Sequence, residues 1–178
     1  MGIRGMSNPL TEEQEEFEDR MDIYMLRLYV FNEYGIWWNG DTKKDITLLI
    51  DGKIQLVEHK YRRCPEIIWD DILVEIMQDM KTHNLGWIYG CGADRLYYVI
   101  CQGEINNEYV SYYYDIDMPK FKEWLFGWLK TEKRPQYRTS LVGYGITLNI
   151  AVPLDIIPEK IIIKKNYIIK NDEDLHSV

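Results

Sequence analysis

The dipeptide Asp51-Gly52, which lies between two runs rich in aliphatic residues, is the feature that most constrains how this chain folds. Such a dipeptide between alternating hydrophobic residues favours a β-hairpin with a two-residue type I′ turn. The segments 45–50 and 53–61 are therefore predicted to be the two strands of the hairpin. Because a two-residue turn also sets the register, Asp45 is predicted to lie directly opposite Glu58.

The same hairpin gathers three charged side chains on one face. Side chains alternate along a strand, so Lys60 shares the face of Glu58. Opposed Cβ atoms lie about 4.5–5.5 Å apart, and two carboxylates at that distance repel each other. A divalent cation between Asp45 and Glu58 offsets the repulsion, and their oxygen ligands suit Mg²⁺ or Mn²⁺. A lysine beside the cation can stabilise charge on a phosphate, so the joint pattern indicates a site that hydrolyses phosphodiesters.

The pattern D-I-x-x-L-x-x-G-x-I-x-L-x-E-x-K-x-R over residues 45–62 resembles the core of PD-(D/E)xK nucleases. Within this superfamily, it resembles especially archaeal Holliday-junction resolvases and phage-encoded relatives. The resemblance is looser through Gly86-Trp87, Ala93-Asp94 and Tyr97–Tyr98. It implies a restriction-endonuclease-like core in which the acid begins the second core strand and E-x-K lies on the third.

Carried over by motif, the resemblance implies that Asp45, Glu58 and the backbone carbonyl of His59 bind the metal and that Lys60 is the catalytic lysine. It implies a Mg²⁺- or Mn²⁺-dependent (endo)deoxyribonuclease that hydrolyses phosphodiester bonds through a metal-activated water. DNA, branched or single-stranded, is the expected partner, and relatives that resolve junctions are homodimers. A phage or viral origin and a role in DNA repair, recombination or degradation are implied in the same way.

The residues alone leave two alternatives to the enzyme open. A catalytically inactive adaptor with the nuclease fold could bind nucleic acid or protein. An unrelated α/β protein could act as an inhibitor whose acidic helix mimics DNA. A Glu-x-Lys triplet by itself usually lies on a solvated strand face, so the enzyme prediction depends on the joint pattern with Asp45.

Several polar residues are candidates for accessory roles, and a solvated surface explains each of them equally well. Relatives often add an acid from the first helix, and Glu18 is one candidate among several acids there. Glu75 and Gln78 are predicted to share one face of a helix that follows the hairpin. Candidate phosphate contacts are Lys43, Lys44, Arg62 and Arg63. The two arginines alternate faces, so at most one points the same way as Lys60.

Hydrophobic spacing predicts the remaining elements. Helices are expected over 11–34, 65–81 and 119–131, and further strands around 87–91, 96–101, 109–114 and 146–154. The order α-β-β-α-β-β-β-α-β predicts one α/β domain over 1–178, with a central mixed sheet flanked by helices. Residues 1–10 and 171–178 are expected to be flexible tails. The imidazole of His59 is predicted to face away from Glu58 and Lys60, where it is packed or hydrogen-bonded.

Charge and cysteine content limit the class of protein only loosely. The formal net charge is −8, but residues 12–22 hold seven acidic residues and one basic residue and 172–174 add three acids, so the rest is near neutral. Charge therefore neither supports nor excludes DNA binding. Three cysteines without a C-x-x-C motif argue against a disulfide framework. A cytoplasmic protein, in the host cytoplasm if phage-encoded, is expected, with no membrane partner.

Overall fold

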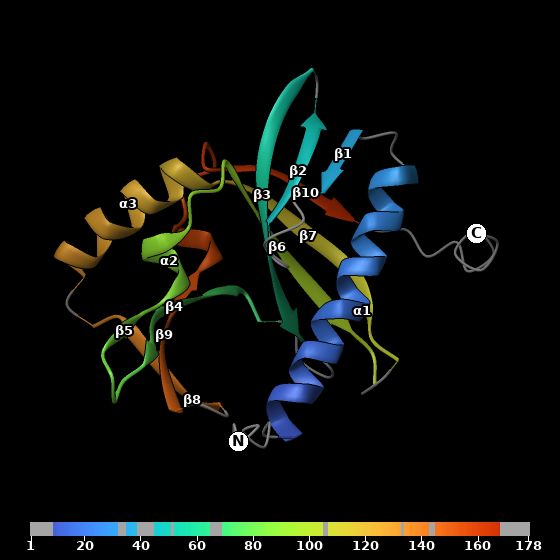
Figure 1. The fold of residues 1–178 in the computed structure, drawn as a ribbon. Helices are drawn as coiled ribbons and strands as arrows, with labels where there is room; N and C mark the ends of the chain where they lie inside the picture. Colours follow the sequence, from blue (N-terminus) through green and yellow to red (C-terminus); the bar gives the residue numbers. More distant parts are fainter. Residues whose placement is uncertain are drawn as a thin grey trace, which may run out of the picture.

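The computed structural model describes residues 9–31, 35–38, 45–50, 52–64, 69–104, 107–132, 134–142 and 145–167. The elements are α1 (Pro9–Phe31), β1 (Gly35–Trp38), β2 (Asp45–Ile50), β3 (Lys53–Arg63), β4 (Asp71–Asp79), β5 (Asn84–Leu85), α2 (Trp87–Gly90), β6 (Arg95–Gln102), β7 (Tyr109–Asp117), α3 (Met118–Thr131), β8 (Gln136–Val142), β9 (Gly145–Pro153), the 3₁₀ turn Leu154–Ile156 and β10 (Ile162–Tyr167) (Figure 1). The expected tails lie outside these residues, except that α1 already begins at Pro9.

The described strands form two sheets. The larger has six strands in the order β1-β2-β3-β6-β7-β10, and the smaller has four in the order β5-β4-β9-β8. β3 and β6 pair in parallel, whereas the other neighbours pair antiparallel. Parallel neighbours need a long crossover, and here it runs through β4, β5 and α2. The prediction of a mixed α/β fold is confirmed at this level, but the four-stranded sheet was not predicted.

The hairpin of β2 and β3 has the predicted register. Ile50 pairs with Lys53, Leu49 with Ile54, Thr47 with Leu56 and Asp45 with Glu58. Gly52 has a φ of 74°, a backbone conformation that glycine adopts without the steric cost other residues incur. Its turn partner Asp51 lies outside the described residues. β3 continues to Arg63, beyond the predicted end of the strand.

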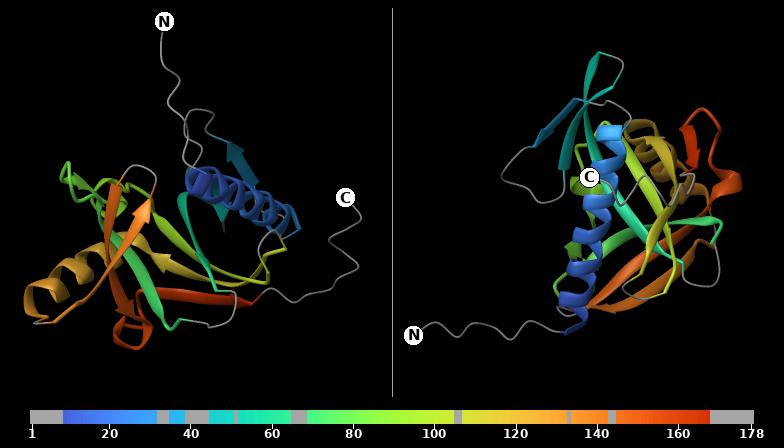
Figure 2. Two further views of the ribbon diagram at one scale, coloured as in Figure 1. Left: turned by 90° about the horizontal axis from the view of Figure 1, so that it is seen from below. Right: turned by 90° about the vertical axis from the view of Figure 1, so that its right-hand side faces the viewer.

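Both faces of the six-stranded sheet are covered (Figures 1 and 2). On one face, Phe17, Met21 and Met25 of α1 pack in a buried cluster with Val57 of β3. On the other face, buried side chains of β6 and β7 pack against β4, β9 and α3. Because side chains alternate along β3, Val57 points toward α1 and Glu58 points toward the second sheet.

The helix predicted over 65–81 is wrong, because Asp71–Asp79 forms strand β4. Ile72, Val74 and Ile76 also recur with a period of two, and all three contribute to the core between the two sheets. β-Branched residues favour the extended backbone, and β4 gains its hydrogen-bonding partner from β9, far along the chain. Local spacing could not distinguish the two outcomes. Residues 65–68 of the predicted helix lie outside the described part.

The strand predicted around 87–91 is also wrong, because Trp87–Gly90 forms the short helix α2. The helices predicted over 11–34 and 119–131 are confirmed as α1 and α3. The strands predicted around 96–101, 109–114 and 146–154 are confirmed as β6, β7 and β9. Strands β1, β5, β8 and β10 were not predicted.

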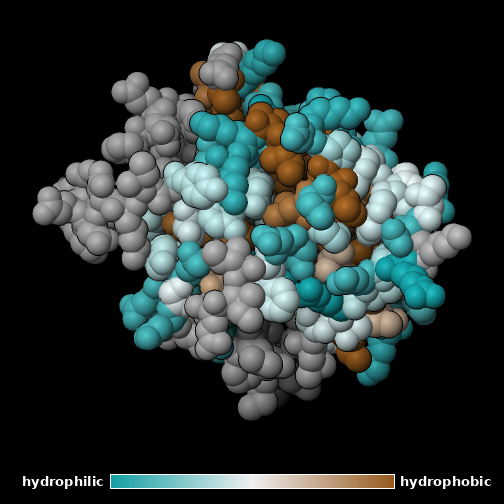
Figure 3. Space-filling model, turned by 180° about the vertical axis from the view of Figure 1, so that it is seen from behind, coloured by the Kyte–Doolittle hydropathy of each residue, from teal (hydrophilic) through white to brown (hydrophobic). Residues whose placement is uncertain are grey.

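The surface carries apolar side chains in several places. On the face turned away from the viewer in Figure 1, hydrophobic residues form a patch interrupted by hydrophilic side chains (Figure 3). Exposed large apolar residues include Ile54, Leu85 and Ile163. Isolated residues of this kind are ordinary on soluble domains. No helix in the described ranges is long and apolar enough to cross a membrane.

We predict that the buried phenol of Tyr98 makes stability depend on pH at the alkaline end. Burial raises the pKa of Tyr98 from 10.0 to about 12, and its oxygen accepts a hydrogen bond of 3.0 Å from the backbone N–H of Leu73. Ionisation is easier in the unfolded chain, so this contribution is complete below pH 10 and is lost as the pH rises through 12. It amounts to at most about 3 kcal/mol.

The measurement is chemical denaturation at pH 9 and pH 11 for the wild type and Tyr98→Phe. The variant should be less stable at pH 9, because the N–H of Leu73 loses its acceptor. It should also lose less further stability by pH 11 than the wild type does. Parallel losses in the two proteins would contradict this assignment.

Candidate active site

The hairpin brings the backbones of Asp45 and Glu58 face to face at its open end. Asp45 is the first residue of β2, and its Cα partner on β3 is Glu58. The side chain of Asp45 lies outside what the structure describes, so the prediction that the two carboxylates meet stays a prediction. The backbone condition for it is met, because directly opposed residues send their side chains to the same face.

Glu58 and Lys60 lie together on the face of β3 turned away from α1. The ammonium of Lys60 forms an ion pair with the carboxylate of Glu58 at 2.5 Å, and their side chains are 25% and 9% exposed. A pair this close, with both groups largely removed from water, is much less screened than a surface ion pair. The shared face predicted from strand alternation is therefore confirmed.

Trp87 of α2 lies against the ammonium of Lys60. The Nζ atom lies 5.1 Å from the centroid of the indole ring, within the range of a cation–π interaction. Trp87 begins α2 immediately after Gly86, whose N–H donates to the carbonyl of Ile76 on β4 at 2.8 Å. Contacts of Trp87 were not predicted, although Gly86-Trp87 forms part of the resemblance.

His59, between the two charged residues, points to the opposite face and contacts α1. Its Nδ1 lies 3.2 Å from a carboxylate oxygen of Asp22 and 3.1 Å from the hydroxyl of Tyr61, which itself donates to Asp22. The ring is buried and stacks with Tyr97. The prediction of a packed, hydrogen-bonded imidazole is confirmed, and its role in joining β3 to α1 through Asp22 was not predicted.

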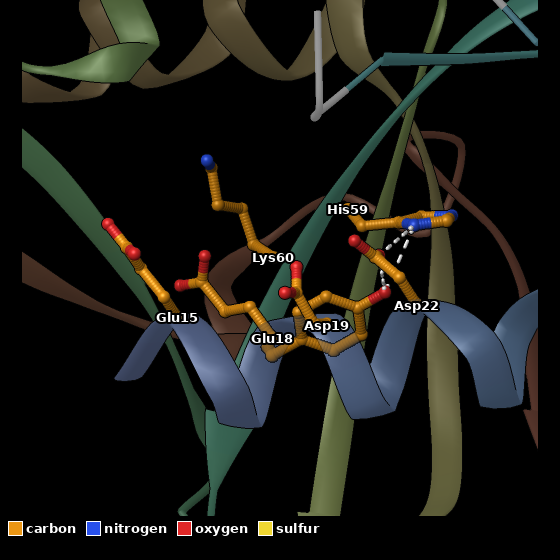
Figure 4. Close-up of a pocket in the computed structure, with 7 residues that line it drawn as sticks. Glu15, Glu18, Asp19, Asp22, His59 and Lys60 are labelled. Carbon is orange, nitrogen blue, oxygen red and sulfur yellow. Dashed lines mark hydrogen bonds and ion pairs between the residues drawn. The ribbon is translucent and has the colours of Figure 1, made fainter. Parts of the chain in front are cut away.

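A groove runs between the acidic face of α1 and β3. Its lining consists of Glu15, Glu18, Asp19, Asp22, His59, Lys60 and Tyr61 (Figure 4). The candidate accessory acid Glu18 therefore borders the same groove as Lys60. The ammonium of Lys60, however, points away from α1 (Figure 4). Nothing in this geometry selects Glu18 over Glu15 or Asp19.

The other accessory candidates are placed differently from the prediction. Glu75 and Gln78 lie on strand β4 and not on a helix, so the argument that they share a helical face is wrong. Glu75 is half-buried and Gln78 is exposed, with an irregularity in the pairing of β4 between Glu75 and Met77. Lys43 and Lys44 lie outside the described residues.

Arg62 and Arg63 point to opposite faces of β3, as predicted. Arg62 lies on the face of Lys60 and donates to Asp71 of β4 at 3.1 Å. Arg63 faces α1, where it donates to Glu13 at 2.8 Å and lies 3.1 Å from the carboxylate of Glu108. Of the two arginines, Arg62 is therefore the one that extends the surface containing Glu58 and Lys60.

Glu108 anchors α1 at the far end of β3. Its side chain is fully buried and is paired with both Arg20 of α1, at 2.9 Å, and Arg63. Burial raises the pKa of this carboxyl, but a backbone hydrogen bond and the two arginines outweigh burial and lower the pKa overall. The anchor was not predicted, because it joins residues distant in sequence.

The donors expected to hold a metal can be compared with the structure only in part. Among the described side chains, no group of three or more His, Cys, Asp or Glu residues could hold a metal ion. The side chain of Asp45 lies outside this described set. Glu58 is the one predicted side-chain ligand with described coordinates, and its carboxylate lies beside an ammonium, as the predicted site requires.

Comparison with protein-family models, with characterised proteins and with solved structures finds no match to this chain.

We predict that Gly86→Ala destabilises the protein and disturbs Trp87. A Cβ at position 86 would lie 2.1 Å from the carbonyl oxygen of Glu75, which belongs to the β4 backbone and cannot rotate away. We expect a loss of about 2 kcal/mol in the free energy of unfolding. Gly90→Ala in the same short helix is the matched control, because a Cβ there meets nothing within 4 Å. Equal stability of the two variants in denaturant titrations would contradict the close packing of α2 on β4.

Proposed function

We propose that the protein is a metal-dependent DNA nuclease whose active site consists of Asp45, Glu58 and Lys60. The observation that supports this proposal most is the ion pair between Lys60 and Glu58. Glu58 is the residue of β3 whose backbone lies directly opposite Asp45. The pair of Lys60 and Glu58, opposite the backbone of an acidic residue, has no evident structural need. A structural role would be served as well by apolar residues, since a largely buried ion pair contributes little net stability.

The donors fit a small divalent cation. Asp45 and Glu58 would supply carboxylate oxygens and His59 a backbone carbonyl oxygen, and such hard ligands suit Mg²⁺ or Mn²⁺. When bound, the ion would supply Lewis-acid polarisation of the phosphate and activation of water. Glu58, the one described side chain of this donor set, is buried, which would protect the ion's interactions from screening by water.

The chain's own residues have distinct tasks in this proposal. Lys60 donates to a phosphate oxygen, where its charge stabilises the additional negative charge of the transition state. Glu58 keeps the ammonium of Lys60 on the correct face, and the indole of Trp87 excludes water from one side of it. The contacts of His59 and Tyr61 with Asp22 hold β3 against α1 and so limit movement of the neighbouring Glu58 and Lys60.

The order of the elements supports a restriction-endonuclease-like core. After α1, the acid Asp45 begins the second strand and Glu58 and Lys60 lie on the third, which is the order the resemblance implies. The third strand then pairs in parallel with β6. DNA as the substrate, a phage or viral origin and a role in repair, recombination or degradation rest on the resemblance of residues 45–62 alone.

One observation favours the alternative, a catalytically inactive adaptor with this fold. The carboxylate of Glu58 already has an ammonium at 2.5 Å, so its charge is compensated without an ion. In an adaptor, the pair of Glu58 and Lys60 would serve only to stabilise this face of β3. Metal binding at Asp45 and Glu58 separates the two functions.

The enzyme is tested by cleavage of labelled branched, single-stranded and duplex DNA with Mg²⁺ or Mn²⁺. We predict that Glu58→Gln and Lys60→Met each lower the cleavage rate at least about 100-fold. The first variant removes the charge of a metal ligand, and the second removes the charge that stabilises the phosphate in the transition state. Glu123→Gln on α3 and Lys53→Met at the other end of β3 are matched controls and should cleave normally. Wild-type rates in the first two variants would indicate a contaminating nuclease and reject the assignment.

Metal binding is tested by calorimetry with Mn²⁺ in the absence of DNA. We predict that binding disappears in Asp45→Asn and in Glu58→Gln but persists in Glu15→Gln and Asp19→Asn, which alter only the groove beside α1. If Glu15→Gln and Asp19→Asn abolish Mn²⁺ binding while Asp45→Asn and Glu58→Gln retain it, the ion binds in the groove beside α1. Absence of binding in the wild type would favour the adaptor.

A further inference from the structure

A cluster of one tryptophan and two arginines lies near the candidate active site, at the start of β4. The indole of Trp69 is 40% exposed, although tryptophan is among the costliest side chains to leave in water. The guanidinium carbon of Arg138 lies 4.7 Å from its ring centroid, and that of Arg62 lies 5.8 Å away. An accessible aromatic surface is thus bordered by two positive charges.

Asp71 holds both guanidinium groups in place. Arg62 of β3 donates to one of its carboxylate oxygens at 3.1 Å, and Arg138 of β8 donates to the other at 2.9 Å. The three side chains join the six-stranded sheet to the four-stranded sheet and together carry one net positive charge. Because one buried carboxylate orients both arginines, little side-chain entropy remains to be lost when a ligand binds.

The chemistry of this cluster matches a nucleotide. Bases of unpaired strands stack on exposed aromatic side chains, and guanidinium groups bind phosphates through paired N–H donors. In duplex DNA the faces of the bases are covered by their neighbours, so an indole can stack only on an unpaired base. The side chain of Arg138 is 33% exposed and that of Arg62 is 12% exposed, which leaves Arg138 as the more accessible phosphate donor.

The cluster lies on the same face of β3 as the candidate active site. Arg62 is two residues beyond Lys60 and four beyond Glu58. At about 3.3 Å per strand residue, Arg62 lies about 13 Å from Glu58 along β3. That distance corresponds to about four nucleotides of a stacked strand, at about 3.4 Å each, and to fewer if the strand is extended.

We propose that Trp69, Arg62 and Arg138 bind an unpaired nucleotide of the DNA strand that enters the candidate active site. This inference rests on the proposed function and adds to it a substrate class, DNA with a single-stranded segment next to the point of cleavage. Trp69 stacks on the base, Arg138 contacts the adjacent phosphate, and Asp71 positions the two arginines.

The test measures binding without cleavage, in EDTA, by fluorescence anisotropy of a labelled oligonucleotide. Trp69→Ala should weaken binding of the single strand by about 5- to 100-fold and leave binding of the same sequence as a duplex unchanged. Trp69→Phe should recover part of the affinity, because it keeps an aromatic face and should fold even if the alanine variant does not. Tyr137→Ala is the matched control, since Tyr137 is exposed beside Arg138 on β8 and lies outside the cluster.

A second readout locates the nucleotide. 2-Aminopurine placed at successive positions of the strand should be quenched on binding at one position, and Trp69→Ala should abolish that quenching. Equal single-strand affinity of the wild type and Trp69→Ala, preference for duplex, or preference for RNA of the same sequence would each overturn the inference. Because no metal is present, these outcomes are independent of whether the protein cleaves DNA.

Discussion

The register of the β2–β3 hairpin is the constraint on which the rest of the candidate site depends. A two-residue connection leaves the strands one pairing, and with it Asp45 opposes Glu58. A shift of one residue would turn Glu58 and Lys60 toward α1 and place Val57 and His59 in their position. Two hydrophobic clusters, one on each face, make such a shift costly, because Val57 is fully buried in the cluster beneath α1.

β3 is held by polar networks on both of its faces. Toward α1, His59 and Tyr61 contact Asp22, and Arg63 reaches the buried Glu108. Toward the second sheet, Lys60 lies over Trp87 and Arg62 binds Asp71. A strand restrained on both sides is a rigid support, which a site requires when charges must be placed to within a fraction of an ångström. Each network also joins β3 to an element distant in sequence.

The sequence predicted those parts of the structure that depend on local chemistry. The register of the β2–β3 hairpin, the shared face of Glu58 and Lys60 and the opposite orientation of His59 all follow from turn geometry and alternation. The helices α1 and α3 have apolar residues at helical spacing and were predicted within a few residues. In α3 the side chain of Asp117 caps the first turn by accepting from the N–H of Lys120.

The remainder depended on partners far along the chain. Residues 71–79 form a strand because β9 pairs with them, and the local spacing of Ile72 and Val74 suits a helix as well as a strand. The edge strand β10 carries Lys164, Lys165 and Asn166, a polar run that its own residues do not mark as a strand and that β7 stabilises by pairing. Trp87 and Asp71 acquire their contacts with Lys60 and Arg62 only through this long-range pairing, so sequence patterns could not have placed them at the site.

In the proposed active site, the carboxylates of Asp45 and Glu58 share one divalent ion beside Lys60. Anomalous diffraction from crystals soaked in Mn²⁺ tests it most directly. We expect one strong peak between the two residues, with oxygen ligands from both at about 2.0–2.4 Å. A peak among Glu15, Glu18 and Asp19 of α1 instead, or none within reach of Glu58, would contradict it.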